Sequence, residues 1–167
     1  MITATQWVEK LGLLPHPEGG YYKETYRSNA IIAKGHTLYN SNGDRNLQTA
    51  IYFLIEDGNF SAFHRIAGDE IWHFYYGNTL LIHEITKDGE LITTQLGNNL
   101  LDGDVLQYTI KAGNWFASEV KSGGSYTLVG CTVAPGFDFN DFELAEKKLL
   151  CAAYPFASEL IARLCRQ

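Results

Sequence analysis

Three side chains able to bind a metal ion or transfer a proton lie close together in the stretch 61–77: His64, Glu70 and His73. Two apolar, aromatic runs flank a short polar turn at 67–69, which predicts an extended chain that folds back and brings these side chains together. An imidazole has a pKa near neutrality, so it can act as a general base or acid at physiological pH. The stretch therefore predicts a site for acid–base or metal chemistry.

A metal centre is one interpretation of these residues, because transition-metal sites combine imidazole and carboxylate ligands. Glu70 and His73 are three residues apart, however, and in a regular strand such residues point to opposite faces. A β-bulge would be required to turn both inward. We therefore predict no metal cofactor, and we keep a divalent metal at His64, Glu70 and His73 as an alternative.

A second polar segment, His-Pro-Glu-Gly-Gly-Tyr-Tyr at 16–22, leads into a predicted strand. Its paired glycines, Gly19 and Gly20, allow positive φ angles or a close approach to another segment. One interpretation is a loop that lines a pocket and contributes Glu18 as a ligand-binding residue. The alternative is a tight turn whose carboxylate is satisfied within the protein.

The elements that position these residues are strands. From residue 20 to residue 134, strand-like runs recur about every 8–12 residues with turn residues between them, which is typical of an all-β barrel or sandwich. Besides the hairpin, the predicted strands are 21–27, 47–55, 80–85, 91–96, 105–110, 115–120 and 125–134. The polar segment 31–45 between two strands is an expected loop and a candidate to close over the pocket.

Helical patterns lie at both ends of the chain. A helix is predicted at 3–13, with Thr3 or Thr5 as its cap. Two further helices are predicted at 141–150 and 154–166. Asp141 is the expected cap of the first of these, and Pro155 stands where the second begins.

The composition of the chain limits the class of protein. The chain has 167 residues, a formal net charge of −6 and no basic run, so we expect one domain over 1–167 and no nucleic-acid partner. No signal-peptide pattern and no apolar run near the ~20 residues that span a membrane are present, so we expect a cytoplasmic protein. The odd number of cysteines predicts free thiols at Cys131, Cys151 and Cys165.

With this order of strands, residues 58–77 resemble the first sequence motif of the cupin superfamily. The Gly, His, Glu and Gly positions of that motif are occupied by Gly58, His64, Glu70 and Gly77. The second His position of the motif is Ile66. In the region that resembles the second cupin motif, Phe116 stands where a metal-binding His is usual. The resemblance therefore retains two of the four usual metal ligands.

Five longer segments resemble a single-domain cupin family of unknown function. They are His-Pro-Glu-Gly-Gly-Tyr-Tyr at 16–22, Phe-His-Arg-Ile at 63–66, Asp-Glu-Ile-Trp-His-Phe-Tyr at 69–75, Ala-Gly-Asn-Trp-Phe-Ala-Ser at 112–118 and Val-Ala-Pro-Gly-Phe-Asp-Phe-Asn-Asp-Phe-Glu-Leu-Ala at 133–145. The resemblance implies a double-stranded β-helix (jelly-roll) barrel with a short N-terminal helix and C-terminal helices packed outside. It also implies a homodimer, and we expect the N-terminal strand to lie near its interface.

The sugar-nucleotide 3,5-epimerases are metal-free cupin-fold enzymes that use a His on the corresponding strand to remove a proton next to a carbonyl. By resemblance to them, His64 would be the base, Glu70 would orient it and Tyr75 would return a proton. This favours a metal-independent isomerase or epimerase acting on a small polar molecule, such as a sugar derivative. A non-catalytic small-molecule binding protein is the alternative, and a metal-dependent cupin enzyme is a second alternative.

Strand alternation, counted from an inward-facing Glu70, predicts the wall of the pocket. The predicted ligand-binding residues, beside the predicted catalytic His64 and Glu70, are Glu18, Trp72, Phe74, Gln107 and Phe116. His73 and Tyr75 are second choices, because alternation directs them to the other face.

Overall fold

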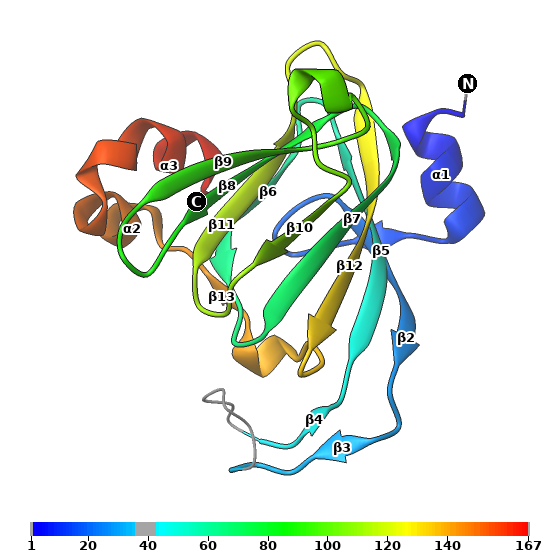
Figure 1. Cartoon of the computed structure of the whole chain (residues 1–167), viewed down its shortest axis with the longest axis vertical. Coiled ribbons are helices and arrows are strands. Elements are labelled where there is room, and N and C mark those ends of the chain that lie inside the picture. The colour runs from blue at the N-terminus through cyan, green and yellow to red at the C-terminus, as the bar shows by residue number, and fades with distance from the viewer. Residues whose placement is uncertain (1, 36–42, 167) are drawn as a thin grey trace.

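The computed structural model describes residues 2–35 and 43–166, and most of its strands form two antiparallel sheets that together make a barrel (Figure 1). The six-stranded sheet has the order β1 (Leu14–Pro15), β2 (Tyr21–Arg27), β5 (Thr49–Glu56), β12 (Tyr126–Ala134), β7 (Asp69–Gly77) and β10 (Gln107–Ile110). The five-stranded sheet has the order β13 (Glu143–Leu144), β6 (Phe60–Arg65), β11 (Trp115–Val120), β8 (Leu80–Ile85) and β9 (Leu91–Leu96). A separate two-stranded ribbon pairs β3 (Ile31–Ile32) with β4 (Arg45–Asn46).

From β5 to β8, and again from β9 to β13, strands that follow each other along the chain alternate between the two sheets. β5 and β7 belong to the six-stranded sheet, whereas β6 and β8 belong to the five-stranded sheet. This exchange between two facing antiparallel sheets is typical of the double-stranded β-helix. The predicted all-β jelly-roll barrel is therefore confirmed.

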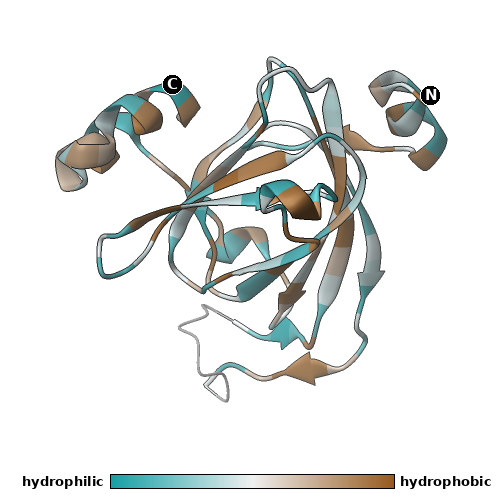
Figure 2. Cartoon of the chain, turned by 45° about the horizontal axis from the view of Figure 1, so that its top comes forward, coloured by the Kyte–Doolittle hydropathy of each residue, from teal (hydrophilic) through white to brown (hydrophobic). Residues whose placement is uncertain are grey.

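Side-chain alternation fills the space between the sheets. On β7, Glu70 and Trp72 are buried, whereas Ile71 and His73 are only partly buried. Trp72 packs in the core with Phe53 at a ring-centroid distance of 5.7 Å. Figure 2 shows hydrophobic and hydrophilic positions alternating along the barrel strands. The period of two places Glu70 in the interior beside an aromatic core.

The N-terminal helix α1 (Ala4–Leu11) begins at a capping box. The Thr3 hydroxyl accepts a hydrogen bond from the Gln6 backbone at 3.2 Å, and the Gln6 side chain accepts one from the Thr3 backbone at 2.9 Å. The helix ends at Gly12, which has a φ of 64°. α1 packs on the outer face of the six-stranded sheet, where the Trp7 indole donates to the Tyr126 hydroxyl at 3.1 Å.

The segment after β12 differs from the sequence prediction of one helix over 141–150. It contains a 3₁₀ turn η2 (Phe139–Asp141), strand β13 and helix α2 (Lys147–Ala153). Asp141 does not cap α2, because it forms an ion pair with Arg45 at 2.6 Å. β13 pairs with β6, so its residues are extended and the helix begins only after it.

Further along, η3 (Pro155–Ala157) leads into α3 (Ser158–Leu164), as the position of Pro155 predicts. α2 and α3 cover the outer face of the five-stranded sheet, where they pack against Phe63 and Ala117. One more 3₁₀ turn, η1 (Leu100–Asp102), follows β9.

The remaining expectations concern a loop, the thiols and membranes. The expected loop 31–45, the candidate to close over the pocket, begins and ends in the β3–β4 ribbon, and its residues 36–42 lie outside the described residues. Cys131, Cys151 and Cys165 are free thiols. In the ranges that the structure describes, none of the helices is long and apolar enough to cross a membrane.

Candidate active site

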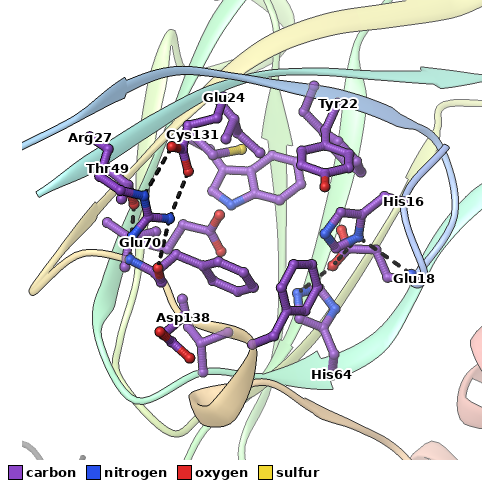
Figure 3. A pocket seen from close by; sticks show the side chains of 17 residues that line it. His16, Glu18, Tyr22, Glu24, Arg27, Thr49, His64, Glu70, Cys131 and Asp138 are labelled. Carbon is purple, nitrogen blue, oxygen red and sulfur yellow. Dashed lines mark hydrogen bonds and ion pairs between the residues drawn. The ribbon is translucent and has the colours of Figure 1, made fainter. Parts of the chain in front are cut away.

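A cavity of about 460 Å³ lies within the barrel. Side chains of β2, β5, β6, β7 and β12 line it, together with residues of the loop before β2 and of the segment after β12. Figure 3 shows His16, Glu18 and His64 on one side of the cavity, and Glu24, Arg27 and Asp138 on the other. The volume suits a small organic ligand.

The loop before β2 brings Glu18 into the barrel. Gly19 has a φ of 112°, and a Cβ atom at this position would lie 2.1 Å from the carbonyl oxygen of Phe60. Only glycine allows this conformation and this close approach. The approach lets Ser61 on β6 donate from Oγ to Oε1 of Glu18 at 2.8 Å, so the predicted pocket loop contributes a buried carboxylate.

Arg166, which follows α3, fixes the backbone of this loop. Its Nε atom donates to the carbonyl oxygen of Glu18 at 2.8 Å, and the guanidinium also donates to the Phe60 carbonyl at 3.0 Å and to Asn59 Oδ1 at 2.7 Å. The guanidinium lies over the Phe60 ring, 4.7 Å from its centroid. The C-terminal segment therefore positions the N-terminal loop.

Glu18 is the partner of the motif histidine, His64. The Nε2 atom of His64 lies 3.1 Å from Oε2 of Glu18, and its Nδ1 atom lies 2.7 Å from the carbonyl oxygen of Ala62. A carbonyl oxygen can only accept a hydrogen bond, so Nδ1 carries a hydrogen. The contact between Nε2 and Oε2 then needs one further proton, on the imidazole or on the carboxyl. The pair therefore holds one proton between its two members.

Burial and charge act on both members of this pair. Burial alone would raise the pKa of Glu18, but the neighbouring His64 and contacts with His16 and Ser61 hold that pKa below its usual range. The pKa of His64 is below its ordinary value, because burial lowers it more than the charge of Glu18 raises it. The carboxylate form of Glu18 is thus favoured at neutral pH.

Glu70 is the second buried carboxyl group of the cavity, and its environment has the opposite effect. Burial, together with the negative charge of Glu18, raises the pKa of Glu70 to about 8. Cys131 on β12 lies beside it, and burial raises the pKa of that thiol well above its usual value. Glu70 is therefore mostly protonated at neutral pH.

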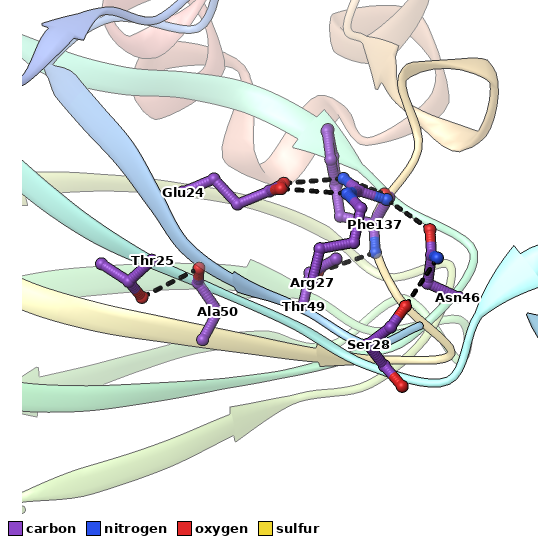
Figure 4. A network of polar contacts seen from close by, with 8 residues as sticks. All are labelled: Glu24, Thr25, Arg27, Ser28, Asn46, Thr49, Ala50 and Phe137. Atoms are coloured by element: carbon purple, nitrogen blue, oxygen red, sulfur yellow. Dashed lines mark hydrogen bonds and ion pairs between the residues drawn. The ribbon is translucent and has the colours of Figure 1, made fainter. Parts of the chain in front are cut away.

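The far side of the cavity carries a polar network (Figure 4). Arg27 donates from Nε and from an η nitrogen to the carboxylate of Glu24, at 3.0 and 2.7 Å. The same guanidinium donates to Asn46 Oδ1 at 2.7 Å and to the carbonyl oxygen of Phe137 at 3.2 Å. Arg27 is therefore already balanced by a carboxylate within the protein.

Comparison with known families shows to which family the chain belongs. The family model described as Cupin superfamily (DUF985) matches residues 5–145. The chain belongs to this cupin family. An uncharacterised protein of Saccharomyces cerevisiae, YML079W, is 29% identical over 148 residues, which cover 81% of this chain and 72% of the yeast protein.

Two solved structures are similar over 99% of both chains. A hypothetical protein from Leishmania major is 34% identical with a TM-score of 0.90. Protein SO0799 from Shewanella oneidensis is 38% identical with a TM-score of 0.87. An uncharacterised protein from Klebsiella pneumoniae with a double-stranded β-helix domain is 15% identical with a TM-score of 0.52, over 82% of this chain and 93% of that one, which is a likeness of fold alone.

The side chains of this cupin do not fit the metal centre of metal-dependent cupins. His64 has both ring nitrogens engaged by protein oxygens, and Ile66 and Phe116 have no donor atoms to offer. His73 faces the other side of the sheet, where it contacts Thr132 at 3.2 Å. Within 2–35 and 43–166, no three His, Cys, Asp or Glu side chains gather so that they could hold a metal ion.

Several predicted site residues of this cupin meet at the cavity. Glu18, His64, Glu70 and Trp72 all line it. Phe116 lies behind His64, at a ring-centroid distance of 4.0 Å, and is fully buried in the core. Glu70 is not the residue that orients His64, because Glu18 makes that contact.

Other predicted site residues lie elsewhere. His73 and Gln107 are opposite each other on β7 and β10, and the Gln107 amide contacts His73 Nδ1 at 2.8 Å on the outer face of the sheet. Tyr75 is 51% exposed and packs against Tyr52. Phe74 packs against the core and lines a different cavity, near α1. Alternation directs His73 outward, and Gln107 opposite it faces the same way. The side chains that line the candidate cavity do not include Tyr75, His73, Gln107 or Phe74.

The cavity of this cupin also contains residues that the sequence reasoning did not single out as site residues. Among them are His16, Cys131 and Asp138. His16 and Asp138 belong to the segments 16–22 and 133–145 that resemble the family. Their place in these segments was the one signal in the sequence that could have identified them as site residues. Cys131 gave no signal, because a buried thiol on a strand is usually a core residue.

Proposed function

We propose that this cupin is a metal-independent isomerase or epimerase that moves a proton at a carbon next to a carbonyl group in a small polar molecule, such as a sugar derivative. One observation carries the proposal: a single cavity contains two acidic groups of opposite protonation preference. The pKa of Glu18 is held below its usual range, and that of Glu70 is raised to about 8. Environments that separate the pKa values of two groups are a common property of acid–base sites.

In this proposal Glu18 is the proton acceptor and His64 is a positioning residue. Both nitrogens of His64 are engaged, by Ala62 and by Glu18, so neither is directed at a ligand. An imidazole that carries the shared proton balances the negative charge of Glu18 inside the barrel. His64 thus keeps Glu18 ionised and oriented.

The step itself is a proton abstraction. Glu18 takes the proton of a C–H bond next to the carbonyl, and the bonding pair stays on the substrate as an enolate. Glu70, protonated at neutral pH, is the available hydrogen-bond donor for the developing charge. Return of a proton to the opposite face of the same carbon gives an epimer. Return to the former carbonyl carbon, while the proton of the adjacent hydroxyl group moves to the former carbonyl oxygen, gives an aldose–ketose isomer.

An uncharged substrate suits this cavity better than a phosphorylated one. The guanidinium of Arg27 is paired with Glu24 and would have to give up that carboxylate to bind a phosphate. Glu18 adds a negative charge on the other side. The charges of the wall therefore support a neutral polyhydroxy aldehyde or ketone.

One observation favours a non-catalytic binding protein as the second candidate. Both carboxylate oxygens of Glu18 already have partners, Oε1 with Ser61 and Oε2 with His64. Such a carboxylate resembles the satisfied buried groups found in protein cores. A binding protein would need only the cavity.

Proton exchange in D₂O distinguishes the two candidates. The protein is incubated with a panel of neutral aldoses and ketoses, and loss of the C–H signal next to the carbonyl is followed by ¹H NMR. We expect exchange with the wild type, a loss of about 10²-fold or more in Glu18→Gln, and no change in Tyr75→Phe, whose hydroxyl lies outside the cavity. His64→Gln should abolish exchange while leaving ligand affinity within about tenfold.

Each outcome of this experiment favours one candidate function or overturns part of the proposal. A compound that raises the melting temperature without any exchange would favour the binding protein. Exchange that Glu18→Gln leaves unchanged would remove Glu18 from the mechanism. A panel in which no compound exchanges would overturn the proposed reaction on this substrate class.

A further inference from the structure

We propose that Glu70 and Trp72 form a subsite that binds the carbonyl oxygen of an uncharged ligand. The inference rests on the proposed function, and it adds the chemical group that is held and the two side chains that hold it. It also gives Glu70 a definite partner on the substrate, the oxygen rather than the carbon.

Trp72 offers a hydrogen-bond donor that the protein itself does not use. Its side chain is 1% exposed, yet Nε1 makes no hydrogen bond with any residue in the part of the chain that the structure describes. Buried N–H groups nearly always have an acceptor. Trp72 lines the cavity, but Nε1 itself is covered in this structure. After a small movement of the side chains around it, an oxygen atom of a ligand in the cavity can be that acceptor.

Glu70 lies beside this indole. The two residues are two positions apart on β7, so their side chains point to the same face. The indole N–H is close enough to lower the pKa of Glu70, against the larger effects of burial and of Glu18. It is outside ordinary hydrogen-bond geometry, however, so the N–H is still available to a ligand.

The groups around Glu70 determine which ligand group fits. The titratable groups that act on it are Glu18, from the loop before β2, and Cys131, from β12. A neutral thiol and a protonated carboxyl give this wall no charge at neutral pH, whereas Glu18 is negative. A carboxylate or phosphate here would meet the repulsion that already raises the pKa of Glu70. A carbonyl oxygen accepts from both donors and brings no charge.

The same two donors suit the reaction. When Glu18 removes a proton from the neighbouring carbon, negative charge develops on the carbonyl oxygen. Donors already in place around that oxygen stabilise an enolate more than the starting carbonyl. An indole N–H and a protonated carboxyl would therefore form the oxyanion-binding part of the site.

The test uses the indole signals in the ¹H–¹⁵N NMR spectrum. The chain has three Trp residues, and Trp72→Phe identifies one signal. The probes are the open-chain ketones dihydroxyacetone and erythrulose, with glycerol and erythritol as matched alcohols without a carbonyl. We expect the ketones to shift the Trp72 signal in a saturable way, and the alcohols to leave it in place at equal concentration. Glu70→Ala should weaken ketone binding by about tenfold.

Trp72 is a core residue, so its variant can fail to fold. In that case the signal is assigned by elimination with Trp7→Phe and Trp115→Phe, and the wild type carries the test. Its Trp72 signal should also titrate with a midpoint near pH 8 as Glu70 ionises, and Glu70→Gln should remove that titration. The Trp7 and Trp115 signals serve as internal controls.

The two proposals fail in different ways. A saturable shift of the Trp72 signal without C–H exchange retains the subsite and overturns the proposed reaction. Exchange that is unaffected in folded Trp72→Phe retains the reaction and overturns the subsite. An equal response to ketones and alcohols, or no response to either, overturns the subsite.

Discussion

The Nε2 atom of His64 and the Oε2 atom of Glu18 are 3.1 Å apart, so the histidine of the cupin motif is paired with a carboxylate from the N-terminal loop. Glu70, the glutamate of the same motif, does not make that contact. Its pKa is raised to about 8, in part by the charge of Glu18. The two carboxyl groups are therefore coupled electrostatically while they favour different protonation states.

Glu70→Gln should change how stability depends on pH. The pKa of Glu70 is higher in the folded state, about 8, than its ordinary value of 4.5, so between these values the folded state holds a proton that the unfolded state has lost. Stability of the wild type should therefore fall as pH rises through this window, by roughly 1.4 kcal/mol per pH unit from this group. The variant should lack this contribution, as measured by urea unfolding at several pH values. Parallel pH curves for wild type and variant would contradict it, and Glu9→Gln on α1 is the control.

Glu18→Gln should lower the pKa of Glu70, because it removes the nearby negative charge that helps to raise it. The midpoint is measured by titrating the carboxyl carbon of Glu70 by NMR. The variant should also lose stability, because the charge interaction between Glu18 and His64 is removed. An unchanged Glu70 midpoint would show that the two carboxyl groups are independent.

Arg166→Ala should loosen the loop that carries Glu18. The arginine and the Ala62 amide both donate to the Glu18 carbonyl oxygen, at 2.8 and 2.9 Å. Loss of the guanidinium should cost about 1–3 kcal/mol of stability and speed hydrogen exchange at the Ala62 amide. Arg163→Ala is the matched control, because its ion pair with Glu119 is on the surface and should contribute less than about 1 kcal/mol. Similar effects of the two variants would show that Arg166 has no special role in fixing the loop that carries Glu18.

Ile66→His restores an imidazole at the second His position of the cupin motif. We expect no tight Zn²⁺ binding from this change alone, because the nitrogens of His64 are still engaged by Ala62 and Glu18. Adding Glu18→Gln removes the charged partner of Nε2 and should increase Zn²⁺ affinity by about tenfold or more, measured by competition with a chromophoric chelator. If the single variant binds as tightly as the double variant, the Glu18 contact does not control metal access.

The sequence predicts the barrel well, because strand alternation and turn residues are local signals. Trp115–Val120 and Leu80–Ile85 begin and end where they were expected. The start of helix α2 was predicted too early in the chain. The residues before it pair with distant partners, β13 with β6 and Asp141 with Arg45. Local patterns contain no information about such partners.

The candidate site was predictable only in part, for the same reason. Alternation from Glu70 correctly predicts that Trp72 faces the cavity, because both are on one strand. The pairing of His64 with Glu18 joins strand β6 to the loop before β2, which is distant in the sequence. It depends on the close approach of the backbone at Gly19. Gln107 was expected inside, but its register opposite His73 turns it outward.

The hydrogen bond between Arg166 and Glu18 joins residues 148 positions apart. A ribosome makes the carboxylate loop early and the arginine that holds it only after both C-terminal helices. During translation the barrel strands can pair before the loop is fixed, so the acid–base pair should reach its final position last. A chain that ends before residue 166 would therefore lack the guanidinium that holds the Glu18 loop from the C-terminal side.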